Sequence, residues 1–160
     1  MLASVRDYWS KKCGARAMPA RQDISPAQLK AQLPHILLID VVEGGADFRY
    51  RLIGTYLRQF FPVDPVGRLM SEVIAPFGAS SVQATLEAYR GVMRKRAPVR
   101  ISGSGAWYAQ SPKYFDAILA PLSDDGEAVN MIFGAFLFEW DSTGQYQYQP
   151  HASLLALMTR

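Results

Sequence analysis

The chain has 160 residues, of which 49% are apolar and 19% are charged. This length allows one domain with a sizeable core, and the balance excludes a disordered chain, which would carry fewer apolar and more charged residues. The net charge of +3 is a mild excess. Its densest basic cluster, 94–96, lies at the end of a predicted helix, where the helix dipole favours cations. We therefore expect no nucleic-acid partner, which would need a basic stripe along one element.

The N-terminus and the cysteine content favour a cytoplasmic protein. Arg6, Asp7 and two Lys stand where a signal peptide needs an uninterrupted apolar core. The single Cys13 cannot form an intrachain disulfide, and one Cys with two His does not make a structural zinc set. The longest apolar run, 131–138, is too short to span a membrane. We expect no metal and no membrane partner.

Two short helices open the predicted fold. Residues 2–13 carry apolar side chains at spacings of three and four, which gives one apolar helix face. The members of this face are Leu2, Val5, Tyr8 and Trp9. Ser25 and Pro26 then offer an N-cap and a first helical residue for a second helix, which must end near Pro34.

Two strands follow, joined by a glycine-containing turn. Residues 35–42 are nearly all apolar and often β-branched, as expected for a strand that is covered on both faces. Apolar and basic residues alternate over 47–53, so we expect Leu52 to share the face of Phe48 and Tyr50.

The middle of the chain is helical. Residues 55–61 and 68–74 predict single short pieces that must lean on their neighbours. Residues 79–96 predict the one long helix. Its apolar stripe consists of Val82, Leu86, Tyr89 and Met93.

Three strands at 99–108, 114–122 and 129–140 complete the domain. Gly103 and Gly105 in the first indicate a bulge or a close backbone approach, and the last strand is apolar on both faces. Two hairpins flanking a helical block predict an α+β fold. We expect a five-stranded antiparallel sheet with helices on one face and an extra N-terminal helix.

This order of elements, together with four sequence segments, resembles a PAS domain. MPARQDISP at 18–26 leads into LPHILLIDV at 33–41, followed by RYRLIGT at 49–55 and a D-x-x-G turn at 64–67. More closely, the chain is similar to a family of small stand-alone bacterial PAS-like proteins, over about residues 18–140. The resemblance implies a sensor or interaction module in which a cupped sheet and short helices surround a cavity. It implies no particular cofactor, because PAS domains hold many ligands or none.

We divide the chain into three parts on this basis. Residues 1–17 form a helix that covers the sheet or mediates dimerisation, 18–141 form the PAS-like domain, and 142–160 form a C-terminal tail. The short helices cover only one face of the sheet, so something else must cover the other. The N-terminal helix of the same chain or of a partner is the natural candidate, and we expect a homodimer built on this helix and the outer sheet.

Catalytic motifs are missing from the sequence, so we assign no catalytic residue. It contains no nucleophile elbow, P-loop, zincin motif or dinucleotide fingerprint, and the glycines at 103 and 105 precede a strand rather than a helix. A haem ligand should come from the helical region, where neither His35 nor His151 lies. Cys13 lies outside the PAS-like core, which argues against a flavin adduct.

A ligand site is expected where aromatic and Met side chains gather between sheet and helices. The candidates are Tyr50, Tyr56, Phe60, Met93, Trp107 and Phe115. For any one of them, plain core packing is the alternative. Buried Tyr hydroxyls and the Trp N–H need partners, however, which favours a pocket for a small ligand. Such a pocket requires a cavity of roughly 300 Å³ or more.

Asp116 is the one acidic candidate. In its apolar strand it either orients a polar ligand or pairs with Arg49, Arg51 or Arg100 across the sheet, and pairing is the more common arrangement for strand charges.

Three functions remain open. The first is a sensory module that binds a small ligand and, having no kinase, cyclase or helix-turn-helix segment, signals through another protein. The second is a pure interaction module with a filled core. The third is a small enzyme that uses Asp116 as its acid or base.

Overall fold

The computed structural model describes residues 1–104 and 114–139. Five strands form one antiparallel sheet in the order β2-β1-β5-β4-β3: β1 (Ile36–Val42), β2 (Asp47–Ile53), β3 (Val99–Ser104), β4 (Tyr114–Leu122) and β5 (Met131–Glu139). The helices are α1 (Leu2–Cys13), α2 (Thr55–Arg58), α3 (Met70–Ile74) and α4 (Ala79–Lys95). Short 3₁₀ turns connect them: η1 (Arg21–Asp23), η2 (Pro26–Leu29), η3 (Leu33–His35), η4 (Glu43–Gly45) and η5 (Ala75–Phe77). The predicted fold class is confirmed.

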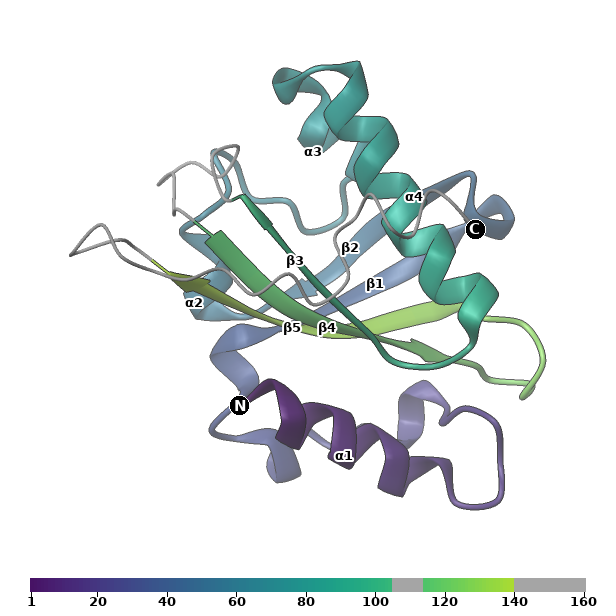
Figure 1. Cartoon of the computed structure of the whole chain (residues 1–160). Helices are drawn as coiled ribbons and strands as arrows, with labels where there is room; N and C mark the ends of the chain where they lie inside the picture. Colours follow the sequence, from purple (N-terminus) through teal and green to yellow (C-terminus); the bar gives the residue numbers. More distant parts are fainter. Residues whose placement is uncertain (105–113, 140–160) are drawn as a thin grey trace.

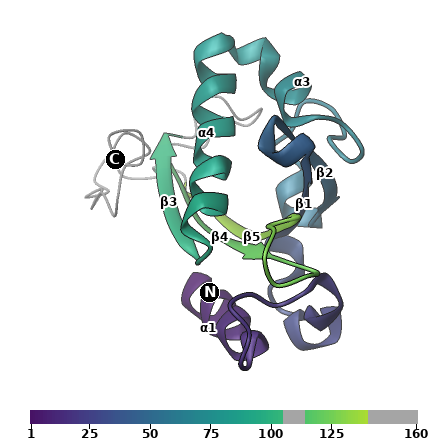
Figure 2. The ribbon, with the colours of Figure 1, turned by 90° about the vertical axis from the view of Figure 1, so that its right-hand side faces the viewer.

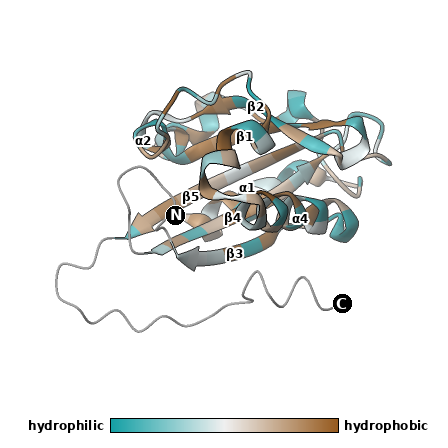
Figure 3. Ribbon diagram, turned by 90° about the horizontal axis from the view of Figure 1, so that it is seen from above, coloured by the Kyte–Doolittle hydropathy of each residue, from teal (hydrophilic) through white to brown (hydrophobic). Residues whose placement is uncertain are grey.

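Helices cover both faces of the sheet. Figures 1 and 2 show α3 and α4 over one face, called the inner face here, and α1 against the opposite, outer face. Strand alternation divides the side chains of β5 between them. Phe136 and Phe138 belong to the inner face, whereas Phe133 meets the ring of Tyr8 from α1 at 6.4 Å between centroids. Because both faces are covered, β5 is hydrophobic along most of its length (Figure 3).

Helix α1 is held on the outer face by packing and by two long-range hydrogen bonds. Its buried side chains are Leu2, Val5 and Trp9, as the helical spacing predicts. The indole Nε1 of Trp9 donates to the carbonyl oxygen of Pro121 at the end of β4, at 2.7 Å. The backbone N–H of Ser25 donates to the hydroxyl of Tyr8, also at 2.7 Å. The N-terminal helix therefore covers the sheet of its own chain.

Arginine and aspartate contacts attach the helical block to the first hairpin. Arg90 of α4 donates from Nε to the carbonyl of Gly45 at 2.8 Å and from Nη2 to that of Ala46 at 3.0 Å. The carboxylate of Asp47 accepts hydrogen bonds from the hydroxyl and the backbone N–H of Ser71 in α3. These contacts place α4 across the inner face, where a pocket can form against the sheet.

The expected position of Leu52 is wrong. The register between β1 and β2 shifts between Leu38 and Ile39, so that Leu38 pairs with Leu52 while Ile39 pairs with Tyr50. Arg51 is the extra residue of this bulge, and a bulge reverses the alternation beyond it. Leu52 consequently leaves the face of Tyr50 and is 39% exposed.

Candidate functional site

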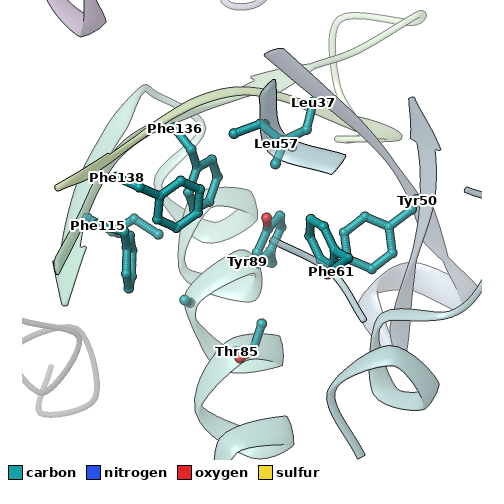
Figure 4. A pocket seen from close by; sticks show the side chains of 11 residues that line it. Leu37, Tyr50, Leu57, Phe61, Thr85, Tyr89, Phe115, Phe136 and Phe138 are labelled. Atoms are coloured by element: carbon teal, nitrogen blue, oxygen red, sulfur yellow. The ribbon is translucent and has the colours of Figure 1, made fainter. Parts of the chain in front are cut away.

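A pocket lies between the inner face of the sheet and helix α4 (Figure 4). All five strands contribute to its lining, α4 supplies one wall, and α2 with the segment after it closes one side. The described residues that line it are Leu37, Tyr50, Leu57, Phe61, Thr85, Ala88, Tyr89, Ile101, Phe115, Phe136 and Phe138. None of these side chains carries a charge.

Three phenylalanines form a flat apolar wall on β4 and β5. The rings of Phe115 and Phe136 have their centroids 5.8 Å apart, and their planes meet at 28°. The rings of Phe136 and Phe138 are 6.2 Å apart, also at 28°. Phe136 and Phe138 point the same way because they are two residues apart on one strand. The near-parallel rings make this side of the pocket apolar and aromatic.

Two tyrosine hydroxyls are the main polar groups of the pocket. Tyr50 comes from β2 and Tyr89 from α4, and each side chain is only 4% exposed. In Figure 4 the hydroxyl of Tyr89 points into the space between the phenylalanine wall and Leu57. Neither hydroxyl is among the buried side-chain atoms that lack a hydrogen-bonding partner in the described part of the chain, which are Ser102 Oγ and Asn130 Oδ1. The third hydroxyl, that of Thr85, already donates to the carbonyl of Ser81 at 2.8 Å.

Both phenols are neutral at physiological pH. Burial, and after it the neighbouring Tyr89 phenol and the Asp47 carboxylate, raise the pKa of Tyr50 well above its usual value. Burial alone raises the pKa of Tyr89. A neutral phenol has one O–H to donate and an oxygen that accepts. The pocket therefore offers two hydroxyls that can bind an uncharged polar atom.

Space in the pocket is limited. The volume between the lining side chains is about 530 Å³, but this includes the mouth that opens to solvent. The enclosed cavity, which is the space that the centre of a water molecule can occupy, measures only about 40 Å³. One water needs about 10–15 Å³ of such space, so the pocket has room for about three. Its enclosed part is therefore below the roughly 300 Å³ expected above for a ligand pocket, and that volume is reached only when the open mouth is included.

Two of the seven predicted site residues line the pocket, Tyr50 and Phe115. Tyr56 and Phe60 lie directly behind it, because the ring of Phe60 packs 3.9 Å from that of Phe138, and Tyr56 contacts both of these rings at 5.3 and 6.4 Å. Burial raises the pKa of the Tyr56 phenol, partly offset by a hydrogen bond with the backbone of Phe138. Both residues support the wall from outside.

Two of the other three predicted residues, Met93 and Asp116, lie elsewhere. Met93 packs beside Gly45 and does not line the pocket. A Cβ built on Gly45 would lie 3.1 Å from the sulfur of Met93. Asp116 alternates with Phe115 and so belongs to the opposite face, where it forms an ion pair with Arg100 across the β3–β4 pair, with Nε 2.9 Å from Oδ1. The pairing expected for this carboxylate is what the structure shows. Trp107 lies outside the described residues, as do His151 and the predicted tail.

Several pocket residues were not predicted as site residues. Tyr89 was assigned to the apolar stripe of the long helix, and the strand alternation of Phe136 and Phe138 was visible in the sequence without a reason to prefer their face. Phe61 was expected at the end of a helical piece at 55–61, but α2 ends at Arg58 and Phe61 lies beyond it. The sequence pattern therefore gave the direction of Tyr89, Phe136 and Phe138 within their own elements. That these three side chains meet in one pocket follows only from the packing of α4 over the sheet.

The described residues contain no group of three or more His, Cys, Asp or Glu side chains that could hold a metal ion. The ring of His35 packs against that of Tyr56 at a tilt of 41°, with centroids 4.2 Å apart, and its Nδ1 lies 3.1 Å from the carbonyl oxygen of Phe136. Cys13 is half-buried at the end of α1, and burial raises the pKa of its thiol, which disfavours the reactive thiolate.

Comparison with known proteins agrees with this architecture. No match was found among curated proteins. No helix within 1–104 or 114–139 has both the length and the apolar character needed to cross a membrane. The profile of a family described as PAS domain matches residues 1–137, a span that includes α1 and ends within β5. The resemblance seen in the sequence is thereby confirmed, and the chain belongs to the PAS domain family.

Proposed function

We propose that this PAS domain is a sensory module that binds a small molecule between its sheet and α4. The observation that supports this most is the position of the pocket. An occupant would touch Leu37, Tyr50 and Ile101 on three strands and Tyr89 on α4, as well as the phenylalanine wall. Binding there would change the fit between the two hairpins and the helical block at the same time.

A route from the pocket to the surface of the domain supports the sensory role. Strand β4 presents Phe115 to the pocket and, at its other end, the carbonyl of Pro121 to Trp9 of α1. Strand β5 presents Phe136 to the pocket and Phe133 to α1. A shift of these strands would therefore be felt by α1, which is a surface that a signalling protein could read. We propose that the output passes to such a partner.

A second candidate function is a protein-interaction module that binds no small molecule. The limited space favours this second function, because the enclosed cavity measures only about 40 Å³. In this case the residual space holds a few waters that satisfy the hydroxyls of Tyr50 and Tyr89. Catalysis is not proposed, since the carboxylate suggested for it, Asp116, is paired with Arg100 on the opposite face.

Native mass spectrometry of the protein purified from its own host distinguishes the two functions. The first predicts that a small molecule is retained by the wild-type chain. Ala88→Leu, which adds three carbons to the pocket wall on α4, should abolish that retention. Asp116→Asn, on the opposite face, is the control and should retain the molecule.

Folding of the variants is checked by circular dichroism and thermal melting. If Ala88→Leu does not fold, Ile101→Phe provides the same obstruction from β3. A wild-type protein that is free of small molecules, or an Ala88→Leu variant that folds and retains the same mass as wild type, would contradict ligand binding in this pocket.

A further inference from the structure

The positive charge of the protein is concentrated in one stretch of the chain. The segment 49–69, from within β2 to the residue before α3, contains four Arg, one Asp and no Lys or Glu. Its net charge of +3 equals that of the whole chain. The chain has 17 basic and 14 acidic residues in all, so 13 of each lie outside this segment and cancel. The excess charge therefore belongs to this segment alone.

The same segment carries most of the exposed apolar side chains. In the described part of the chain, the large hydrophobic residues that are exposed are Met1, Leu52, Val63 and Val66. Three of these four lie within 49–69, where they are between 39% and 45% exposed. Single exposed apolar residues need no explanation, but a group of them surrounded by polar side chains marks an interaction site.

Backbone hydrogen bonds place the two ends of the segment side by side at the edge of the sheet. The N–H of Gly67 donates to the carbonyl of Tyr50 at 2.7 Å, and the N–H of Tyr50 donates to the carbonyl of Arg68 at 3.1 Å. In addition, Nη1 of Arg49 donates to the carbonyl of Gly67 at 3.0 Å. Val66 therefore lies beside β2, although it is far from that strand in the sequence.

An ion pair connects the middle of the segment to the same edge. Nη1 of Arg58, the last residue of α2, lies 3.3 Å from Oδ2 of Asp64. Oδ1 of Asp64 accepts a hydrogen bond from the backbone N–H of Val66 at 3.1 Å. Val63 precedes Asp64 directly, so the exposed apolar residues and the arginines form one continuous surface, which we call the β2-edge surface.

The four arginines of the β2-edge surface are all exposed, and two of them are not neutralised. Arg51 forms an ion pair with Asp40 of β1, with Nη1 3.2 Å from Oδ1, and Arg58 is paired as described above. Arg49 and Arg68 form no ion pair with any residue that the structure describes. These two guanidinium groups can bind carboxylates of another molecule.

The composition of the β2-edge surface favours a protein partner over a membrane. Its cations are all Arg, which is enriched in protein–protein interfaces, whereas Lys is depleted there. A guanidinium group also matches the geometry of a carboxylate, to which it can donate two parallel hydrogen bonds. Membrane-surface segments instead present Trp, Phe or Leu side chains that insert between lipids. Two of the three exposed apolar side chains here are the short side chains of Val.

We propose that the β2-edge surface binds an acidic segment of a partner protein in which carboxylates and apolar side chains are interspersed. Arg49 and Arg68 bind the carboxylates, while Leu52, Val63 and Val66 contact the apolar side chains. This inference goes beyond the proposed function and does not depend on an occupant of the pocket. The surface is also separate from α1, which packs on β4 and β5.

The probe is a short, fluorescently labelled peptide in which Glu and Leu alternate, and its binding to the full chain is measured by fluorescence anisotropy. A peptide in which Glu and Ser alternate lacks the apolar part. Vesicles of phosphatidylserine and phosphatidylcholine present negative charge on a membrane. We expect the Glu/Leu peptide to bind about tenfold more tightly than the Glu/Ser peptide, less tightly as salt is raised, and the vesicles not to bind.

The double variant Arg49→Gln/Arg68→Gln removes two charges from the surface and should weaken binding of the Glu/Leu peptide about tenfold or more. The matched control is Lys11→Gln/Lys95→Gln, which lowers the net charge equally at exposed positions on α1 and α4 and should bind as wild type does. Leu52→Ser should weaken binding of the Glu/Leu peptide but not of the Glu/Ser peptide. Circular dichroism verifies that each variant folds.

The inference is wrong if wild type does not bind the Glu/Leu peptide at millimolar concentration, or if the two double variants bind it equally. Equal affinities for the two peptides would contradict the role of the apolar side chains, as would an unchanged affinity of Leu52→Ser. Binding of vesicles in preference to the Glu/Leu peptide would make this a membrane surface and would also overturn the proposal. The proposed function is tested separately, since retention of a small molecule does not involve these exposed residues.

Discussion

Gly54 lies at the point where the end of β2 passes closest to the 3₁₀ turn before β1. Its N–H donates to the carbonyl of Ile36 at 2.7 Å, and a Cβ built on it would overlap with the backbone carbonyls of Leu33 and Pro34. A glycine is needed here for close approach of two backbone segments rather than for an unusual φ. The contact matters for the pocket because α2 begins at the next residue and carries Leu57 into the lining.

We predict that Gly54→Ala destabilises the domain by about 2–3 kcal/mol, the upper part of the range for overpacking, because rigid backbone atoms must move. The free energy of unfolding is measured by urea denaturation. The control is Thr55→Ala, an exposed neighbour at the start of α2, which should change stability by less than about 0.5 kcal/mol. Similar stabilities of the two variants would show that η3 adjusts without cost.

At the level of single residues, the sequence predicted which kinds of side chain line the pocket better than it predicted where each side chain lies. Tyr50 and Phe115 line the pocket as the strand alternation led us to expect, because alternation determines which way a strand side chain points. Leu52 was misplaced because the bulge at Arg51 leaves no mark in the sequence. Tyr56 and Phe60 were close, but one turn of helix cannot be oriented from its own pattern, since its direction depends on packing against Phe138.

At the level of elements, the pattern predicted the order of strands and the helices α1 and α4, but the helix expected between Ser25 and Pro34 is a pair of 3₁₀ turns, Pro26–Leu29 and Leu33–His35. The continuous apolar stretch of β5 indicated a strand covered on both faces, and α1 and α4 indeed lie on its two sides. The apolar spacing of α1 correctly predicted its buried side chains. The pattern could not predict which atoms attach α1 to the sheet. That depends on the carbonyl of Pro121, which lies at the very end of β4 next to the edge of α1.

We predict that Trp9→Phe lowers the free energy of unfolding by about 1–3 kcal/mol. The substitution keeps an aromatic ring on the outer face but leaves the buried carbonyl of Pro121 without its donor. Urea denaturation measures the stability, and amide hydrogen exchange of α1 shows whether the loss is local to this helix.

Ser10→Ala on the exposed side of α1 is the matched control and should leave stability within about 0.5 kcal/mol of wild type. Equal stability of Trp9→Phe and wild type would mean that the hydrogen bond to Pro121 contributes nothing to the attachment of α1.

At the scale of the whole molecule, the outer face determines how two copies could associate. The sequence led us to expect a homodimer built on the N-terminal helix and the outer sheet. In the single chain α1 already covers that face, and its exposed side is largely polar, with Ser4, Arg6, Asp7 and Ser10. A dimer through the same surfaces therefore requires two chains to exchange α1. The exposed segment 14–17, which starts at Gly14 with φ of +57°, is the connection that would have to open.

The exchanged dimer is tested by lengthening this connection. We predict that the wild-type chain sediments as a dimer, and that inserting six Gly/Ser residues between Gly14 and Ala15 shifts it to the monomer. In the single chain α1 already lies on its own sheet, and a longer, flexible connection favours this arrangement over exchange. The same insertion between Pro62 and Val63, in the exposed segment between α2 and α3, should leave the dimer intact. A wild-type monomer at all concentrations, or a dimer that both insertions leave unchanged, would contradict exchange of α1.

Deleting α1 would be a weaker test, because it exposes the apolar outer face around Phe133 and so favours aggregation whichever arrangement is present.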